Sequence, residues 1–312
     1  MNKSFSERIQ LIRSRRNPEN RIKVANSRHG LTLDEALKTT DDLHEFILEA
    51  MCEVDDSYTK RTKDAGNKVK GILEKSVTCD FRYQGSVMTD THIKGASDID
   101  LLCLGHRSLY DEAKNPARER VLCSQRLRGL GYNVVSGAKS LQVKPTTYSI
   151  KVDVVNGTWN TSYQPESCRL IRIYNAKVQS MEKGDYPFIS IKNINERSAD
   201  TQGRLKKMIR FLKNLKEDSN SPIKLSSFEI NAICYGIDVN SYYKCNYVQL
   251  VNVLTCYIWK KFVENGSYPQ DIMSVTGEDY PFRDNPSAIV EVRKLYNDLF
   301  PIWQILHNAR EI

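Results

Sequence analysis

Two aspartates stand at a spacing that could bind a metal ion beside nucleotide phosphates. Asp98 and Asp100 lie one residue apart at the start of the apolar run over residues 98–104. Because successive side chains of a strand point to opposite faces, both carboxylates would share the face opposite Ile99 and Leu101. Two carboxylates at such a short distance repel each other. A bound Mg²⁺ ion would remove that repulsion, because it prefers oxygen ligands and keeps phosphate and water in its coordination shell. The pair therefore predicts a metal site that acts on phosphates.

A glycine–serine turn precedes the aspartate pair. With Gly85 at a turn, the chain could approach a phosphate closely, and the amides of Gly85 and Ser86 and the Ser86 hydroxyl could all donate hydrogen bonds to it. Most Gly-Ser pairs are ordinary turns, so this interpretation depends on the aspartates that follow.

A third carboxylate follows on a second predicted strand, residues 148–155. Its apolar residues alternate with Ser149, Lys151 and Asp153, a pattern that is typical of a half-buried strand and puts Asp153 on the face away from the core. If this strand lies beside the first, three carboxylates converge, and two cations could be held for an in-line displacement at phosphorus. Each aspartate alone fits a solvated strand face equally well, so the hypothesis rests on the combination.

These motifs resemble those of the DNA polymerase beta-like nucleotidyltransferase superfamily and, within it, the cGAS/DncV-like nucleotidyltransferases (CD-NTases) of bacterial antiphage defence. The resemblance implies that Gly85 and Ser86 bind the donor triphosphate. It also implies that Asp98, Asp100 and Asp153 are the catalytic residues and coordinate two Mg²⁺ ions, or Mn²⁺ in their place. The implied fold is α+β and bilobal: a polymerase beta-like core, with a mixed sheet and helices, and a helical C-terminal lobe.

A basic helix and a serine pair carry a second part of the resemblance. Residues 203–216 place apolar side chains on one helix face, and for most of the basic residues on the rest we expect a solvated surface. These basic residues are Arg204, Lys206, Lys207, Arg210, Lys213 and Lys216. The resemblance implies that Lys206, with Lys207 or Arg210 as alternatives, and Ser227 contact the donor phosphates. For Phe228, which follows the serines, we expect a place in the core.

Hydrophobic periodicity and turn residues predict the remaining organisation. We expect a nucleotidyltransferase lobe over residues 1–165 that includes a long N-terminal helix, and a mainly helical nucleotide-binding lobe over 166–312. The long helix should reach Ser76, and Gly66 could interrupt it. The other expected elements are a helix from Pro116 to about Gly129, strands near 134–135 and 141–143, a loop at 157–162, a hairpin over 170–191 around residues 183–185, and helices over about 199–217, 226–239, 246–264 and 287–310.

The composition is that of an ordinary globular protein of 312 residues. Its net charge of +8 favours anionic partners such as nucleotides, RNA or DNA. The 8 cysteines include no C-x-x-C pair, so we expect reduced thiols and neither a disulfide framework nor a zinc site. Because we find neither a signal peptide nor a long apolar run, we expect a cytoplasmic protein that makes no membrane contact. We also expect a monomer.

The resemblance implies an enzyme that joins nucleoside triphosphates, such as ATP or GTP, into a cyclic di- or oligonucleotide with release of pyrophosphate. It needs no nucleic-acid template, and a downstream effector would sense the product. Two alternatives stay open. The first is a template-independent nucleotidyltransferase that modifies RNA ends or a protein side chain, which would use the same aspartates. The second is an inactive module that binds nucleotides or RNA.

Overall fold

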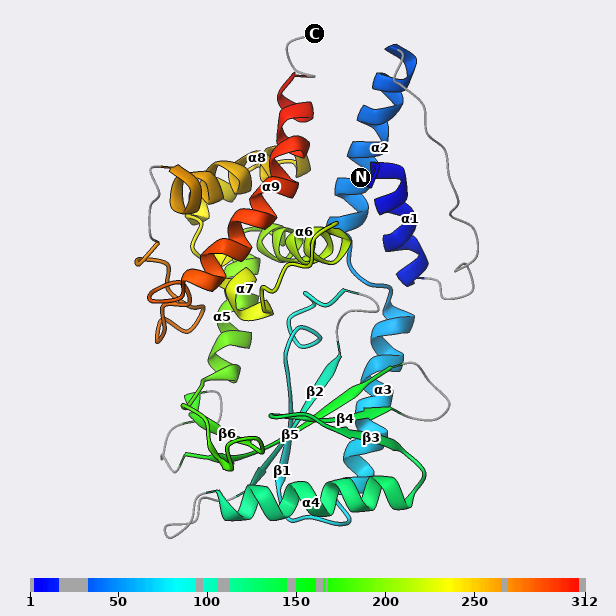
Figure 1. The fold of residues 1–312 in the computed structure, drawn as a ribbon, viewed down its shortest axis with the longest axis vertical. Helices are drawn as coiled ribbons and strands as arrows, with labels where there is room; N and C mark the ends of the chain where they lie inside the picture. Colours follow the sequence, from blue (N-terminus) through cyan, green and yellow to red (C-terminus); the bar gives the residue numbers. More distant parts are fainter. Residues whose placement is uncertain are drawn as a thin grey trace. The chain divides into compact units, whose positions relative to one another are not determined.

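The computed structural model describes residues 3–16, 33–93, 98–105, 113–144, 150–160, 165, 168–264 and 269–308 (Figure 1). The helices are α1 (Phe5–Arg16), α2 (Leu33–Met51), α3 (Asp56–Leu73), α4 (Lys114–Gly129), α5 (Pro187–Asp200), α6 (Arg204–Asp218), α7 (Ser227–Tyr235), η3 (Val239–Tyr242), α8 (Tyr247–Ile258), η4 (Trp259–Val263) and α9 (Pro286–Asn308). The strands are β1 (Asp80–Gln84), β2 (Ile99–Gly105), β3 (Asn133–Ser136), β4 (Leu141–Lys144), β5 (Val152–Trp159), β6 (Ile171–Asn175) and β7 (Ser180–Met181). None of the helices described here has the length and apolar character needed to cross a membrane.

The chain divides into two compact units. The first, called the helical unit below, combines Met1–Val54, Thr91–Ala96 and Asn193–Ile312, and the second, called the sheet unit, combines Asp55–Asp90 and Ser97–Lys192. This division differs from the boundary that we expected near residue 165. The chain beyond that point still belongs to the sheet unit because β6 pairs with β5, and α2 belongs to the helical unit because it packs on α6.

Helix α6 forms the centre of the helical unit. It contacts α1, α2, α7, α8 and α9, and its apolar face is fully buried in their common core. The residues on this face are those that the helical spacing predicts: Leu205, Met208, Ile209, Leu212 and Leu215. The periodicity therefore identified the core-facing side of this helix correctly.

Two basic residues of α6 are buried, so the prediction of a solvated surface is wrong for them. Arg210 is 1% exposed, and its Nε donates to the carbonyl of Met51 at 2.8 Å. Lys213 is 6% exposed, and its Nζ donates to the carbonyl of Thr91 at 3.0 Å. Their aliphatic stems pack in the core while the charged ends satisfy backbone carbonyls, which a polar–apolar pattern does not reveal.

The sheet unit is built on a mixed sheet with the strand order β1-β2-β5-β4-β3. The central pair β2 and β5 is parallel, whereas β1 with β2, β4 with β5 and β3 with β4 are antiparallel. Strand β6 pairs with the second half of β5, beyond the residues that pair with β4. Helices α3 and α4 contact these strands and cover one face of the sheet (Figure 1).

The alternation of side chains along β2 gives the sheet two different faces. Ile99, Leu101 and Cys103 face the core beneath α3 and α4. Leu102 and Leu104 belong to a smaller apolar cluster on the other face, with residues of β5 and β6. Asp100 follows the same alternation and therefore stands on the face opposite α3 and α4.

The long helix that we expected is two helices. It breaks at residues 52–55, where the Asp55 side chain accepts a hydrogen bond from Tyr58 N and caps α3. Gly66 lies inside α3, where an added Cβ atom would lie 2.9 Å from the ring of Tyr83. The prediction of an interruption at Gly66 is wrong because this glycine serves close packing, and α3 ends at Leu73.

The remaining predictions are confirmed in type and adjusted in extent. The helix near residue 116, the strands near 134 and 141, and the later helices are present. The predicted loop at 157–162 is wrong up to Trp159, because β5 continues to that residue. The predicted hairpin turns at residues 176–179 instead of 183–185, and α5 begins at Pro187. Tyr148 and Ser149, at the start of the predicted third strand, lie outside the described residues.

Candidate active site

Asp100 and Asp153 lie directly opposite each other on the parallel strands β2 and β5. Each is the second residue of its strand, so the two carboxylates stand at the same edge of the sheet, on the face away from α3 and α4. Neighbouring strands are about 4.8 Å apart, which brings opposed carboxylates within reach of a shared cation. The structure thus brings together the two aspartates that the sequence places more than fifty residues apart.

Asp98 joins this face directly before β2, and Lys151 joins it directly before β5. The Lys151 ammonium donates to a carboxylate oxygen of Asp98. Burial lowers the pKa of Lys151, but the hydrogen bond and the negative charge of Asp98 outweigh it, so the pKa is raised overall. Strand alternation alone predicts that Lys151 shares this face with Asp153, but it does not predict the ion pair with Asp98; the available signal is a cation two residues before an aspartate on the same strand face.

The environment of Asp153 favours a cation. Burial, followed by the negative charge of Asp98, raises the pKa of Asp153 to about 6, although Lys151 lowers it. Its Oδ1 is buried and has no hydrogen-bond partner among the described residues. A buried carboxylate oxygen without a donor costs free energy, and a divalent cation would relieve that cost together with the repulsion between the aspartates. The residues present therefore fit a metal site.

The predicted glycine–serine turn follows β1 and lies against Asp100. Gly85 has φ +85°, and a Cβ atom added there would lie 2.4 Å from Asp100 Oδ2. The turn is closed by a hydrogen bond from Met88 N to the carbonyl of Gly85 at 3.1 Å. Among the described residues the Ser86 hydroxyl has no hydrogen-bond partner. Glycine is required here both for the backbone conformation and for the approach of the carboxylate.

Lys206 and Ser227 both belong to the helical unit. Lys206 lies in the first turn of α6, and Ser227 is the first residue of α7, a helix that contacts α6. Ser226, the residue before, caps α7 in a capping box with Glu229. Ser227 is exposed, and its hydroxyl has no partner in the part of the chain that is described. Phe228 is 43% exposed, so the expectation that it lies in the core is wrong.

Comparisons with protein families and with single proteins both match this chain to nucleotidyltransferases. Residues 192–304 match the family model of the cGAS/DncV-like nucleotidyltransferase C-terminal helical domain. The chain is 35% identical to a c-di-GMP synthase of Lachnospiraceae bacterium (strain RUG226), with 97% of this chain and 99% of that protein covered.

Two solved structures share both the sequence and the fold. The STING-associated CdnE c-di-GMP synthase from Capnocytophaga granulosa superposes with a TM-score of 0.82 at 35% identity, over 98% of this chain and 100% of that one. The corresponding enzyme from Flavobacteriaceae sp. superposes with a TM-score of 0.81 at 31% identity, over 99% of this chain and 100% of that one. The likeness therefore extends over both units and not only over the matched helical domain.

Proposed function

This chain belongs to the cGAS/DncV-like nucleotidyltransferases and is a nucleotidyltransferase, and from this premise we propose that it joins two molecules of GTP into c-di-GMP. The observation that carries the chemistry is the register of β2 and β5, which sets Asp100 opposite Asp153. The choice of GTP is supported by the Lachnospiraceae, Capnocytophaga and Flavobacteriaceae relatives, all of which are c-di-GMP synthases.

Asp98, Asp100 and Asp153 would hold two Mg²⁺ ions, for which Mn²⁺ could substitute, because hard cations bind carboxylate oxygens. When bound, such ions supply the positive charge that stabilises a reacting α-phosphate and the departing pyrophosphate. The fit is supported by the buried Oδ1 of Asp153, which has no donor among the described residues, and by the raised pKa of that carboxylate.

In the proposed reaction, a ribose hydroxyl of one GTP attacks the α-phosphorus of the other. A bond forms from the hydroxyl oxygen to phosphorus, and the bond from phosphorus to the bridging oxygen breaks, so that pyrophosphate leaves with the electron pair. Asp153 would orient the attacking hydroxyl, whose proton passes to the carboxylate or to water. A second transfer of the same kind closes the ring.

The residues proposed to hold the donor triphosphate are those that the family resemblance implies, and their chemistry suits the task. The amides of Gly85 and Ser86 and the Ser86 hydroxyl would donate to phosphate oxygens at the sheet unit. Lys206 would supply a positive charge and Ser227 a hydroxyl to the same triphosphate. The capping of α7 by Ser226 supports the role proposed for Ser227, because it leaves the Ser227 side chain available.

We also propose the biological setting. The product would be sensed by a STING-type effector, as the STING association of the Capnocytophaga and Flavobacteriaceae enzymes suggests, and the pathway would serve antiphage defence. The enzyme would work in the cytoplasm as a monomer, without a template.

The test is to incubate the purified protein with the four nucleoside triphosphates and Mg²⁺ and to identify phosphatase-resistant products by mass spectrometry. We expect a product with the mass of c-di-GMP that forms from GTP alone. The matched control is the double variant Asp98→Asn plus Asp100→Asn, which should form none.

Other products would overturn the proposal. Label that appears only on added RNA or on the protein would indicate the alternative nucleotidyltransferase activity. A different cyclic product would support the nucleotidyl-transfer reaction but contradict the choice of GTP as substrate. If no product forms with Mg²⁺ or with Mn²⁺, both the reaction and the substrate are contradicted.

A further inference from the structure

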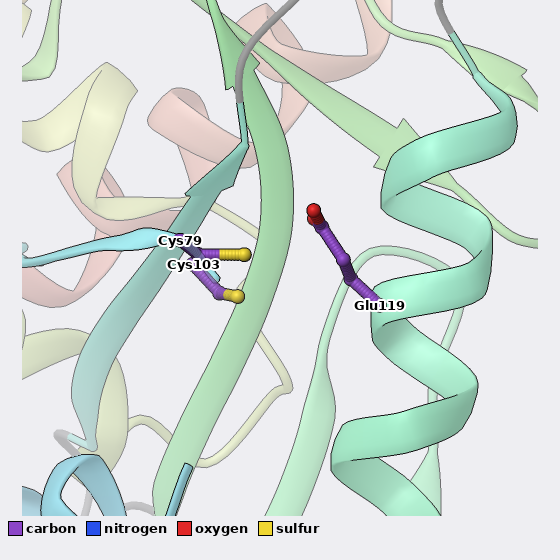
Figure 2. A group of neighbouring side chains, drawn as sticks. All are labelled: Cys79, Cys103 and Glu119. Carbon is purple, nitrogen blue, oxygen red and sulfur yellow. The ribbon is translucent and has the colours of Figure 1, made fainter. Parts of the chain in front are cut away.

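Two cysteines and a glutamate gather in the sheet unit (Figure 2). Cys79 directly precedes β1, Cys103 lies on β2, and Glu119 reaches toward both sulfur atoms from α4. The two sulfur atoms and a carboxylate oxygen of Glu119 all lie within 4.8 Å of one another. The three side chains therefore converge from three separate elements.

The cluster stands on the opposite face of the sheet from the aspartates. Cys79 and Cys103 pack in the core beneath α3 and α4, whereas Asp100 stands on the other face. Cys103 and Asp100 are an odd number of residues apart on β2, which separates them by the thickness of the sheet and by about 10 Å along the strand. A metal ion bound at the cluster would therefore be distinct from the catalytic ions.

The position of Glu119 is built into the packing. A Cβ atom added at Gly105 would lie 2.7 Å from Glu119 Oε1, so the glycine on β2 makes room for the carboxylate.

Two buried polar side chains next to the cluster supply an independent observation. Asn156 and Thr158 on β5 are fully buried and stand opposite Cys103 and Gly105 in the parallel register. Neither Asn156 Oδ1 nor Thr158 Oγ1 has a hydrogen-bond partner among the described residues. Buried polar atoms are almost always satisfied, so two of them side by side indicate a partner such as a metal ion and its water.

We propose that Cys79, Cys103 and Glu119 bind a structural zinc ion. Two thiolates with one carboxylate form a donor set that suits Zn²⁺, whereas Mg²⁺ prefers oxygen ligands alone. A water molecule in the fourth position could hydrogen-bond to Asn156 Oδ1 and Thr158 Oγ1. The ion would tie the chain before β1 to β2 and α4. The cysteine spacing predicts no zinc site because the ligands are far apart in the sequence, and only the fold brings them together.

The experiment measures zinc in the full-length protein, purified without chelator or added metal. We expect about one zinc ion per chain in the wild type. Cys79→Ser and Glu119→Gln should each weaken zinc binding at least about 100-fold in competition with a chromogenic chelator. The matched control is Cys168→Ser, which removes another partly buried thiol of the same unit outside the cluster and should keep the zinc.

Cobalt gives a second readout that does not depend on catalysis. Replacement of the ion by Co²⁺ should produce thiolate-to-cobalt charge-transfer absorption in the wild type and in Cys168→Ser, and less of it in Cys79→Ser. Circular dichroism checks that each variant is folded. Equal zinc content in all four proteins, no tight binding by folded wild type after incubation with Zn²⁺, or a Cys79–Cys103 disulfide in the freshly purified protein would each overturn the proposal.

Discussion

The lack of a side chain at Gly85 is what lets the Asp100 carboxylate lie against the turn. We predict that Gly85→Ala lowers kcat/KM for GTP at least about 100-fold, because the new methyl group would displace a proposed metal ligand or the phosphate-binding turn. The control is Gly131→Ala, since Gly131 has a similar φ of +81° but no atom within 4 Å of an added Cβ. Both variants should lose about 1 kcal/mol of stability through backbone strain, and only the first should lose activity. Pyrophosphate release measures the rates, and equal activity of the two variants would contradict the role of this contact.

Asp153 should destabilise the metal-free protein at neutral pH. Its pKa is raised to about 6 in the folded state, so the fold favours the protonated form and loses stability as the pH rises from the unfolded pKa through the folded one. We predict that Asp153→Asn raises the melting temperature of the metal-free protein at neutral pH by a few degrees, which corresponds to about 1 kcal/mol after allowance for its partial exposure.

The pH and the metal ion provide the controls for this prediction. The difference between wild type and Asp153→Asn should shrink near about pH 4, where the wild-type carboxyl is protonated. Mg²⁺ should raise the melting temperature of the wild type and have less effect on the variant. A variant that melts below the metal-free wild type at neutral pH would show that the carboxylate has a stabilising partner.

At the level of elements, two adjacent serines at the start of α7 have different roles: Ser226 stabilises the helix, and Ser227 is a candidate phosphate ligand. Ser226 accepts a hydrogen bond from Glu229 N and closes the capping box, whereas the Ser227 hydroxyl has no partner among the described residues. We predict that Ser226→Ala costs about 1 kcal/mol of stability. Ser227→Ala should leave stability unchanged and raise KM for GTP about tenfold, because it removes a hydrogen bond to a charged phosphate. Thermal unfolding and steady-state kinetics distinguish the two, and an unchanged KM in Ser227→Ala would remove this residue from the site.

Helix α6 is held to the end of α2 by a buried arginine. Arg210 donates to the carbonyl of Met51 and lies 3.5 Å from the carboxylate of Glu53. We predict that Arg210→Met costs about 2–3 kcal/mol, because it leaves a buried carbonyl without its donor. Lys207→Met, an exposed position on the same helix, should change stability by less than about 0.5 kcal/mol. Urea denaturation measures both values, and equal costs would contradict the anchoring role.

The elements that the sequence predicts well are those in which apolar residues recur at regular spacing over the whole segment. The core face of α6 and the alternation of β2 could be read directly, because burial on one side fixes the period. The sequence predicts the second half of a hairpin where α5 begins, because Gly184 and Asp185 resemble a turn, but the chain turns earlier. Arg210 and Lys213 show a further limit: their burial depends on backbone carbonyls of remote segments, which no local pattern contains.

At the scale of the whole molecule, some groups of functional side chains follow from short sequence motifs, and others follow only from the contacts of the fold. The three aspartates and the Gly85–Ser86 turn could be predicted because a short motif carries each of them. The pairing of Lys151 with Asp98 and the cluster of Cys79, Cys103 and Glu119 could not, because they depend on which strands and helices become neighbours. The two compact units are also discontinuous in sequence, so no single boundary could describe them.

The net charge of +8 belongs to the whole molecule and should act on substrate capture. A positive protein attracts GTP over a distance that salt shortens, so we predict that added NaCl raises KM for GTP and leaves kcat nearly unchanged.

If no template is needed, nuclease treatment of the protein should leave the rate of cyclic product formation unchanged. Added RNA should inhibit at low salt as a competing polyanion and lose this effect at high salt. Product formation that disappears after nuclease treatment and returns with added RNA would instead identify nucleic acid as an activator.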